Sequence, residues 1–118
     1  MNFQLTDQQL SIQNITRQLA QTELLPTVLK DDEEGKFPEK AYAKMGQMGL
    51  IGLPFPKEYG GQGCDPLTYI MCVEEMSKVC ATTGVIVSAH TSLCADPIMT
   101  YGTEEQKQKY LVPLAKGE

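Results

Sequence analysis

The chain has 118 residues and a formal net charge of −5, with 42% hydrophobic and 21% charged residues. This length suits one domain with its own core, and the composition is ordinary for a globular protein. Arg17 is the only arginine and the lysines are scattered, so the clustered cations that bind nucleic acid or an anionic membrane surface are missing. We therefore expect one soluble domain, residues 1–118, with no nucleic-acid and no membrane partner.

The first predicted helix begins at a capping box. The Thr6 hydroxyl can accept from the amide of Gln9, whose side chain can reach back to the Thr6 amide. An apolar stripe at helical spacing follows, formed by Ile12, Ile15 and Leu19. Pro26 should end or kink this helix near Leu25, and a second short helix should run to Gly35.

A third helix is predicted from Phe37-Pro38 to Gly49, with proline near its first position and glycine as its C-terminal cap. Its predicted inner face consists of Ala41, Met45 and Met48. A short extended apolar stretch, 50–56, should follow. The glycine-rich loop 59–63 lacks the G-x-G-x-x-G spacing, so turns that need positive φ are a better interpretation than a phosphate site.

Asp65-Pro66 is a second clear helix start. This helix should lie centrally, because its apolar residues spread widely around it: Leu67, Tyr69, Ile70, Met71, Cys72, Val73, Met76 and Cys80. The stretch 79–95 contains no charged residue and is too polar for a membrane span, which predicts a helix buried in protein from about Thr83 to Ala95. Pro97 should kink it or start a new turn. A second capping box at Thr103 should open the last helix, ending near Gly117, and no strand is expected.

Residues with catalytic or metal-binding chemistry are few. His90 is the only histidine and has no carboxylate three or four positions away, so a metal site is not expected. Of the adjacent Glu74 and Glu75, we expect one to be solvated and the other paired with a lysine. The four cysteines contain no C-x-x-C pair and should be buried free thiols, which favours the cytoplasm. The N-terminus has no basic region followed by an apolar run, so we expect no secretory signal. It is not rich in arginine, so we expect no mitochondrial presequence.

Four stretches, in this order and spacing, resemble the N-terminal domain of flavin-dependent acyl-CoA dehydrogenases across nearly the whole chain. They are Phe37-Pro38 with 46–53; Pro56-Lys57-Glu58-Tyr59-Gly60-Gly61-Gln62-Gly63; Glu74-Glu75-Met76-Ser77 running into Thr82-Thr83-Gly84; and Tyr101-Gly102-Thr103-Glu104-Glu105-Gln106-Lys107 with Leu111, Pro113, Leu114, Gly117 and Glu118. The run 83–93, followed by Pro97-Ile98, is most similar to short-chain, butyryl-CoA members from bacteria.

The resemblance implies an all-α bundle of about five to six helices that forms the first of three domains. In the family a glutamate removes the α-proton of the acyl-CoA, FAD takes the β-hydride, and electrons pass to an electron-transferring flavoprotein. The glutamate and the flavin segment would lie beyond Glu118, so this chain alone is expected to bind no FAD and to be inactive. Members of the family are usually tetramers. A non-catalytic helical interaction module is the alternative.

Ile86, Ala89, His90 and Leu93 are spaced to share one helical face. By resemblance, this region lines the tail end of the acyl pocket, which makes these four residues the predicted substrate-binding set. For His90 two interpretations stay open. It is either a core histidine hydrogen-bonded to a carbonyl, or a ring that, with Ile86, fills space which longer-chain members leave open.

Overall fold

A computed structural model describes all residues, 1–118, as helices and turns without a strand. The α-helices are α1 (Asp7–Leu19), α2 (Val28–Glu34), α3 (Glu39–Gln47), α4 (Pro66–Val79), α5 (Ala81–Ala89), α6 (Asp96–Tyr101), α7 (Glu104–Gln106) and α8 (Val112–Lys116). A 3₁₀ turn, Lys57–Tyr59, precedes α4. The π-helical turn Ala20–Leu24 extends α1, while His90–Ala95 joins α5 to α6 and Lys107–Leu111 joins α7 to α8. These joins leave six continuous helices, which confirms the predicted all-α fold.

The predicted helix ends are confirmed in atomic detail. The Gln9 amide donates to Thr6 Oγ1 at 3.2 Å and the Thr6 amide donates to Gln9 Oε1 at 2.9 Å. Thr103 and Gln106 form the same reciprocal pair at the start of α7. Asp65 caps α4 by accepting from the Thr68 amide at 2.7 Å. These side chains satisfy amides that a helix leaves unpaired at its first turn.

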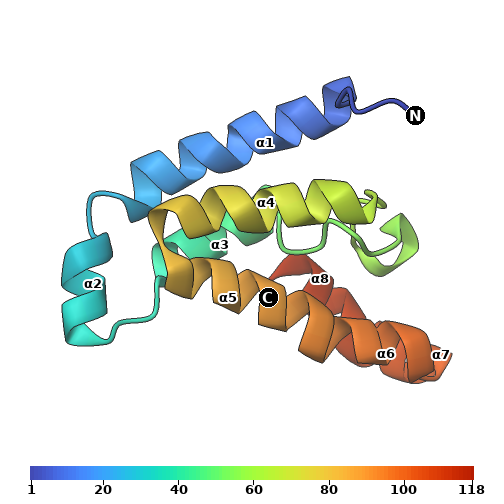
Figure 1. Cartoon of the computed structure of the whole chain (residues 1–118). Helices are drawn as coiled ribbons and strands as arrows, with labels where there is room; N and C mark the ends of the chain where they lie inside the picture. Colours follow the sequence, from blue (N-terminus) through green and yellow to red (C-terminus); the bar gives the residue numbers. More distant parts are fainter.

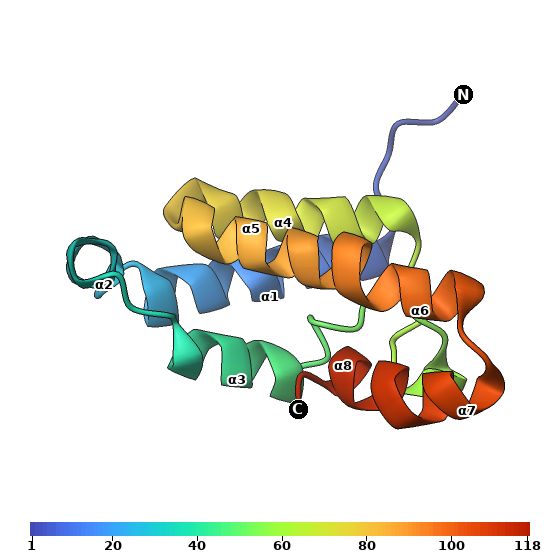
Figure 2. The ribbon, with the colours of Figure 1, turned by 90° about the horizontal axis from the view of Figure 1, so that it is seen from below.

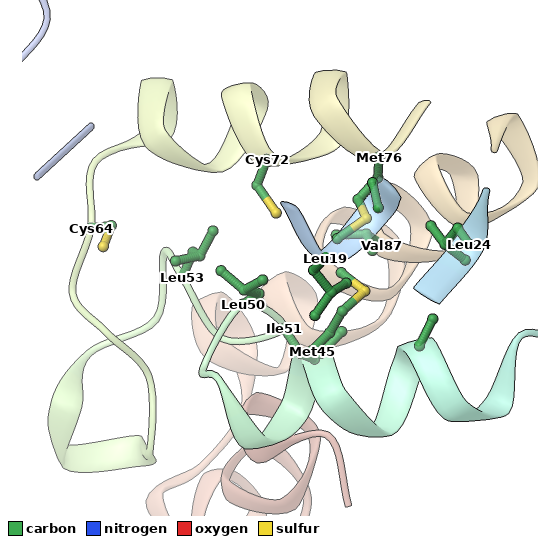
Figure 3. Packing of buried hydrophobic residues seen from close by; sticks show 12 residues of the cluster. Leu19, Leu24, Met45, Leu50, Ile51, Leu53, Cys64, Cys72, Met76 and Val87 are labelled. Atoms are coloured by element: carbon green, nitrogen blue, oxygen red, sulfur yellow. The ribbon is translucent and has the colours of Figure 1, made fainter. Parts of the chain in front are cut away.

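Helix α4 lies between α1 and α5, as Figure 1 shows, so its predicted central place is confirmed. Helices α3 and α8 lie beneath these three, and α2 stands off at one end (Figures 1 and 2). Side chains from α1, α3, α4, α5 and the loop after α3 point toward one another in the main core (Figure 3). Among its fully buried members are Met45, Leu50, Ile51, Leu53, Cys72, Met76 and Val87. A second, smaller cluster joins the loop at Phe55 to the C-terminal helices.

Three details of the sequence-based prediction are wrong. Met48 is 47% exposed instead of lying on the inner face of α3. The stretch 50–56 consists of turns instead of extended chain, although its apolar side chains are buried. The turns are tight because Gly52 lies against the backbone of Ala115, where a Cβ would clash. On α4, Leu67 and Ile70 are 50% and 55% exposed, since they lie away from both neighbouring helices.

Candidate functional site

The uncharged segment Ala81–Ala95 forms α5 and the π-helical turn after it. Its inward face contacts α4 and the core through residues about four positions apart, namely Thr83, Gly84, Val87, Thr91 and Ala95. Gly84 permits a close approach to α4, because a Cβ there would overlap Ser77 Oγ and lie 3.0 Å from Ser77 Cβ. The inward face therefore fixes this segment firmly against α4.

The outward face of the same segment is uncharged and open, and it exposes Thr82 and Ser92 as well as apolar side chains. Val85 is 66% exposed, Leu93 is 77% exposed, and Cys94 is also exposed. Within this chain, the predicted burial of this helix is therefore met only on its inward face. The lack of charge predicted burial, but no other part of the chain reaches this face. Large exposed apolar side chains that gather on one face are typical of surfaces that meet a partner or a ligand.

The four residues predicted to bind substrate lie on this segment but differ in exposure. Ile86, Ala89 and His90 are half-buried, whereas Leu93 is open to solvent. The π-helical turn starts at His90, so the regular α-helical spacing on which the prediction rested ends there. The His90 ring contacts Tyr42 of α3 and Leu114 of α8, whereas Leu93 lies on the outward face.

His90 makes two contacts inside the domain. Its Nε2 lies 3.0 Å from the carbonyl oxygen of Leu114, and its Nδ1 lies 3.5 Å from the hydroxyl of Tyr42. The Tyr42 and His90 rings meet edge to face, with centroids 6.3 Å apart. Burial lowers the pKa of His90, and the Leu114 carbonyl opposes this in part. The carbonyl hydrogen bond required by the core interpretation of His90 is therefore present.

The glutamate pair of α4 has a structural role. Glu74 is 58% exposed, whereas Glu75 is 2% exposed and pairs with Arg17 at 3.0 Å and with Lys78 at 2.9 Å. The hydrogen bond from Arg17 is the largest cause that lowers the pKa of Glu75. Burial opposes it, and Lys78 lowers the pKa further, so that it falls to about 2. The prediction of one solvated and one paired glutamate is confirmed only in part, because the exposed Glu74 also pairs with Lys78, at 3.2 Å. The Arg17 partner was missed because it lies far away in sequence.

The thiols and glycines offer no binding chemistry. Cys64 and Cys72 are buried and Cys80 is half-buried, but Cys94 is exposed, which corrects its predicted burial. Burial raises the pKa of Cys72 to about 11, so this thiol stays protonated. No group of three or more metal-ligating side chains exists. Gly60 and Gly63 have positive φ, which confirms the turn interpretation of the glycine-rich loop.

The chain matches a family model, described as the N-terminal domain of acyl-CoA dehydrogenase, over residues 6–118. The chain belongs to this family. It is 58% identical to a short-chain-specific acyl-CoA dehydrogenase of Clostridium acetobutylicum, covering all of this chain and 31% of that protein. It is 45% identical over 99% of its length to a probable acyl-CoA dehydrogenase of Bacillus subtilis, again covering 31% of the relative.

Solved structures agree with this assignment. Butyryl-CoA dehydrogenase from Megasphaera elsdenii superposes with a TM-score of 0.91 at 39% identity, covering 99% of this chain and 31% of that one. A chain from a structure described as the electron transferring flavoprotein of Acidaminococcus fermentans superposes with a TM-score of 0.95 at 50% identity, covering 99% and 31%. The chain thus spans about a third of the length of the relatives it matches.

The surroundings of the glycine-rich loop are those of a structural turn. The glycine-rich loop faces its own backbone, because a Cβ at Gly61 would clash with the Phe55 carbonyl group. A separate hollow of about 500 Å³ lies between α2 and the α4–α5 turn, where Leu24, Val28, Phe37 and Cys80 are among its lining residues. The sequence did not predict this hollow.

No helix is long and apolar enough to cross a membrane.

Proposed function

We propose that this domain walls the acyl pocket of an FAD-dependent enzyme that introduces an α,β double bond into short-chain acyl-CoA. One observation supports this most directly. A chain of this family presents an uncharged, apolar helical face, with Val85 and Leu93 exposed, that nothing within the chain covers. The full match along residues 6–118 favours this proposal over a non-catalytic interaction module.

The chemistry of the outward face suits an uncharged hydrocarbon tail. Each buried methylene contributes about 0.8 kcal/mol when it leaves water for an apolar wall. No charged side chain lies between Val79 and Ala95, so an acyl group ending in a second carboxylate would find no cation on this face. A structural relative of 31% identity is described as a glutaryl-coenzyme A dehydrogenase in complex with glutaryl-CoA. We propose instead that the substrate of the enzyme containing this chain has an uncharged acyl tail.

Ile86, Ala89 and Leu93 are the proposed wall. The His90 ring belongs to the same substrate-binding set, but both of its nitrogens are engaged inside the domain. The contribution of this chain is to place the tail and exclude water. By resemblance to the family, the glutamate base and the FAD would be supplied by the rest of a longer protein.

The proposal extends to the partners and the compartment of the longer protein. We propose an electron-transferring flavoprotein as electron acceptor and a homotetramer for the longer protein. A structural relative comes from a structure described as an electron transferring flavoprotein. Four unpaired thiols fit a reducing compartment such as the cytoplasm.

The deciding experiment assays the longer protein that contains this domain with butyryl-CoA and a dye electron acceptor. Leu93→Lys should lower kcat/KM for butyryl-CoA by at least about tenfold, because an unpaired charge would be buried against the tail. The matched control is Gln108→Lys, since Gln108 is exposed on another helix and the new charge stays in water. Equal activity of both variants, at normal flavin content, would contradict the proposed wall.

The 118-residue chain by itself gives a second test. We expect it to purify without bound flavin and without dehydrogenase activity, because by resemblance to the family both the flavin segment and the base lie outside residues 1–118. A yellow protein with a bound-flavin absorbance spectrum would show that the division of roles between domains is wrong.

A further inference from the structure

The hydrogen bond at one edge of the His90 ring determines which nitrogen carries the proton. Nε2 lies 3.0 Å from the Leu114 carbonyl oxygen. A carbonyl oxygen can only accept, so Nε2 must donate and must carry a hydrogen. Because burial lowers the pKa of His90, the ring is neutral at physiological pH, and Nδ1 therefore has a lone pair and no hydrogen.

Nδ1 then needs a donor, and the structure supplies one from α3. The Tyr42 hydroxyl lies 3.5 Å from Nδ1, at the long end of hydrogen bonding, and no other donor is in range. The Tyr42 ring is supported in turn by Phe37, with ring centroids 5.6 Å apart. His90 is thus held from two sides at once, by α3 through Tyr42 and by α8 through Leu114.

We propose that Tyr42 and His90 are positioning residues that set how far the outward face of the Ala81–Ala95 segment protrudes, and with it the acyl-chain length accepted. This inference rests on the proposed function. His90 is the first residue of the π-helical turn that ends at Ala95, and Leu93 lies within that turn. Tyr42 contacts the segment through the His90 ring, whereas Leu93 is exposed to solvent.

The position of such a wall matters because discrimination between acyl chains is steric. One methylene in an apolar pocket changes specificity by only about 10–200-fold. A small displacement of the turn that carries Leu93 is therefore enough to admit a longer tail. The two hydrogen bonds of His90 hold the segment to α3 and α8 and oppose its movement away from these helices.

The activity test uses the flavin-loaded longer protein with butyryl-CoA and hexanoyl-CoA. Tyr42→Phe removes one hydroxyl and keeps the ring, and it should raise the hexanoyl-to-butyryl ratio of kcat/KM about 2–5-fold. His90→Ala should raise the ratio further, while His90→Gln, which keeps an N–H donor, should restore part of the original ratio. Tyr110→Phe is the matched control, because Tyr110 is 47% exposed, and it should leave the ratio unchanged.

The outcomes separate the possible explanations. An unchanged ratio in Tyr42→Phe, with only His90→Ala shifted, would overturn the positioning role and leave the His90 ring as a direct filler of space. Absence of acyl-CoA dehydrogenase activity in the unsubstituted protein would overturn the proposed function and the chain-length role together.

Nitrogen-15 NMR of the 118-residue chain tests the geometry without any activity. His90 is the only histidine, so its ring signals need no assignment. We expect the Nε2–H tautomer, with an Nδ1 signal that moves in Tyr42→Phe while the Nε2 signal stays. The inference would be overturned by the Nδ1–H tautomer, or by an Nδ1 signal that has the same position in Tyr42→Phe as in the unsubstituted chain. Either result would count even if the enzyme proves active on butyryl-CoA.

Discussion

The two faces of the Ala81–Ala95 segment are built from similar residues and have opposite surroundings. Val87 points into the core and is 0% exposed, whereas Val85, two positions earlier, is 66% exposed. No charged residue marks either face. The comparison shows that apolar composition alone does not distinguish a face that is buried within the domain from one that is exposed.

The strongest test of this contrast uses one substitution at two positions. Val87→Ala should lower the free energy of unfolding by about 2–3 kcal/mol, because it removes methyl groups from a close-packed core. Val85→Ala should change it by less than about 0.5 kcal/mol. Denaturant unfolding of both variants measures the difference. Similar losses would mean that the outward face is also packed in the isolated chain.

Helix α4 offers a similar contrast between charged neighbours. Glu75→Gln should cost on the order of 2 kcal/mol at pH 7, because Arg17 and Lys78 lose a buried partner. Glu74→Gln should cost less than about 0.5 kcal/mol, since Glu74 is an exposed partner. The test compares urea unfolding of the two variants. An equal loss at both positions would contradict the buried ion pair.

The pH dependence of stability adds a second measurement on Glu75. Its pKa in the folded chain is lowered from the ordinary 4.5 to about 2, so the ionised form favours folding. The stabilisation should be complete above pH 4.5 and lost as the pH falls from 4.5 toward 2. Glu75→Gln should flatten this part of the stability curve, and Glu74→Gln should not.

Local signals in the sequence predicted most of the fold. The capping boxes, Asp65-Pro66, Gly35 and Gly49 act over a few residues, so their motifs identified the helix ends correctly. Contacts between distant segments could not be predicted in the same way. The Arg17–Glu75 pair joins residues 58 positions apart, and the π-helical turn at His90 has no sequence signature.

The candidate site shows the same limit. Apolar spacing predicted that Ile86, Ala89, His90 and Leu93 share one helical face, but in the structure Leu93 is exposed while His90 contacts the interior of the domain. Their separation into a ring held from inside and an exposed leucine depends on the π-helical turn and on Leu114, 24 residues away from His90. Tyr42 was not identified from the sequence, because nothing in α3 indicates that it faces this histidine.

The two capping boxes extend the contrast to the helix ends. Thr6→Ala should cost about 1 kcal/mol, because Gln9 is buried and also donates to Asp65 at 3.0 Å. Thr103→Ala should cost about half as much, since its box is exposed at the start of the short α7. Thermal midpoints measure both. A larger effect at Thr103 would show that the C-terminal helices limit stability.

The smallest effect on stability, and the most informative for function, is expected on the outward face. Val85→Ser combined with Leu93→Ser should change the free energy of unfolding by no more than about 1 kcal/mol, since both side chains are already in water. The isolated chain should self-associate with rising concentration, because its open apolar surface is covered most readily by a second copy. The double substitution should weaken that association, as measured by sedimentation velocity over a concentration series. Leu29→Ser, at a position 80% exposed on α2, is the control for loss of any exposed leucine and should weaken it less. A chain that stays monomeric at every concentration would argue against an adhesive outward face. If association depends on Leu29 and not on Leu93, the surface through which two copies meet lies on α2 and not on the outward face.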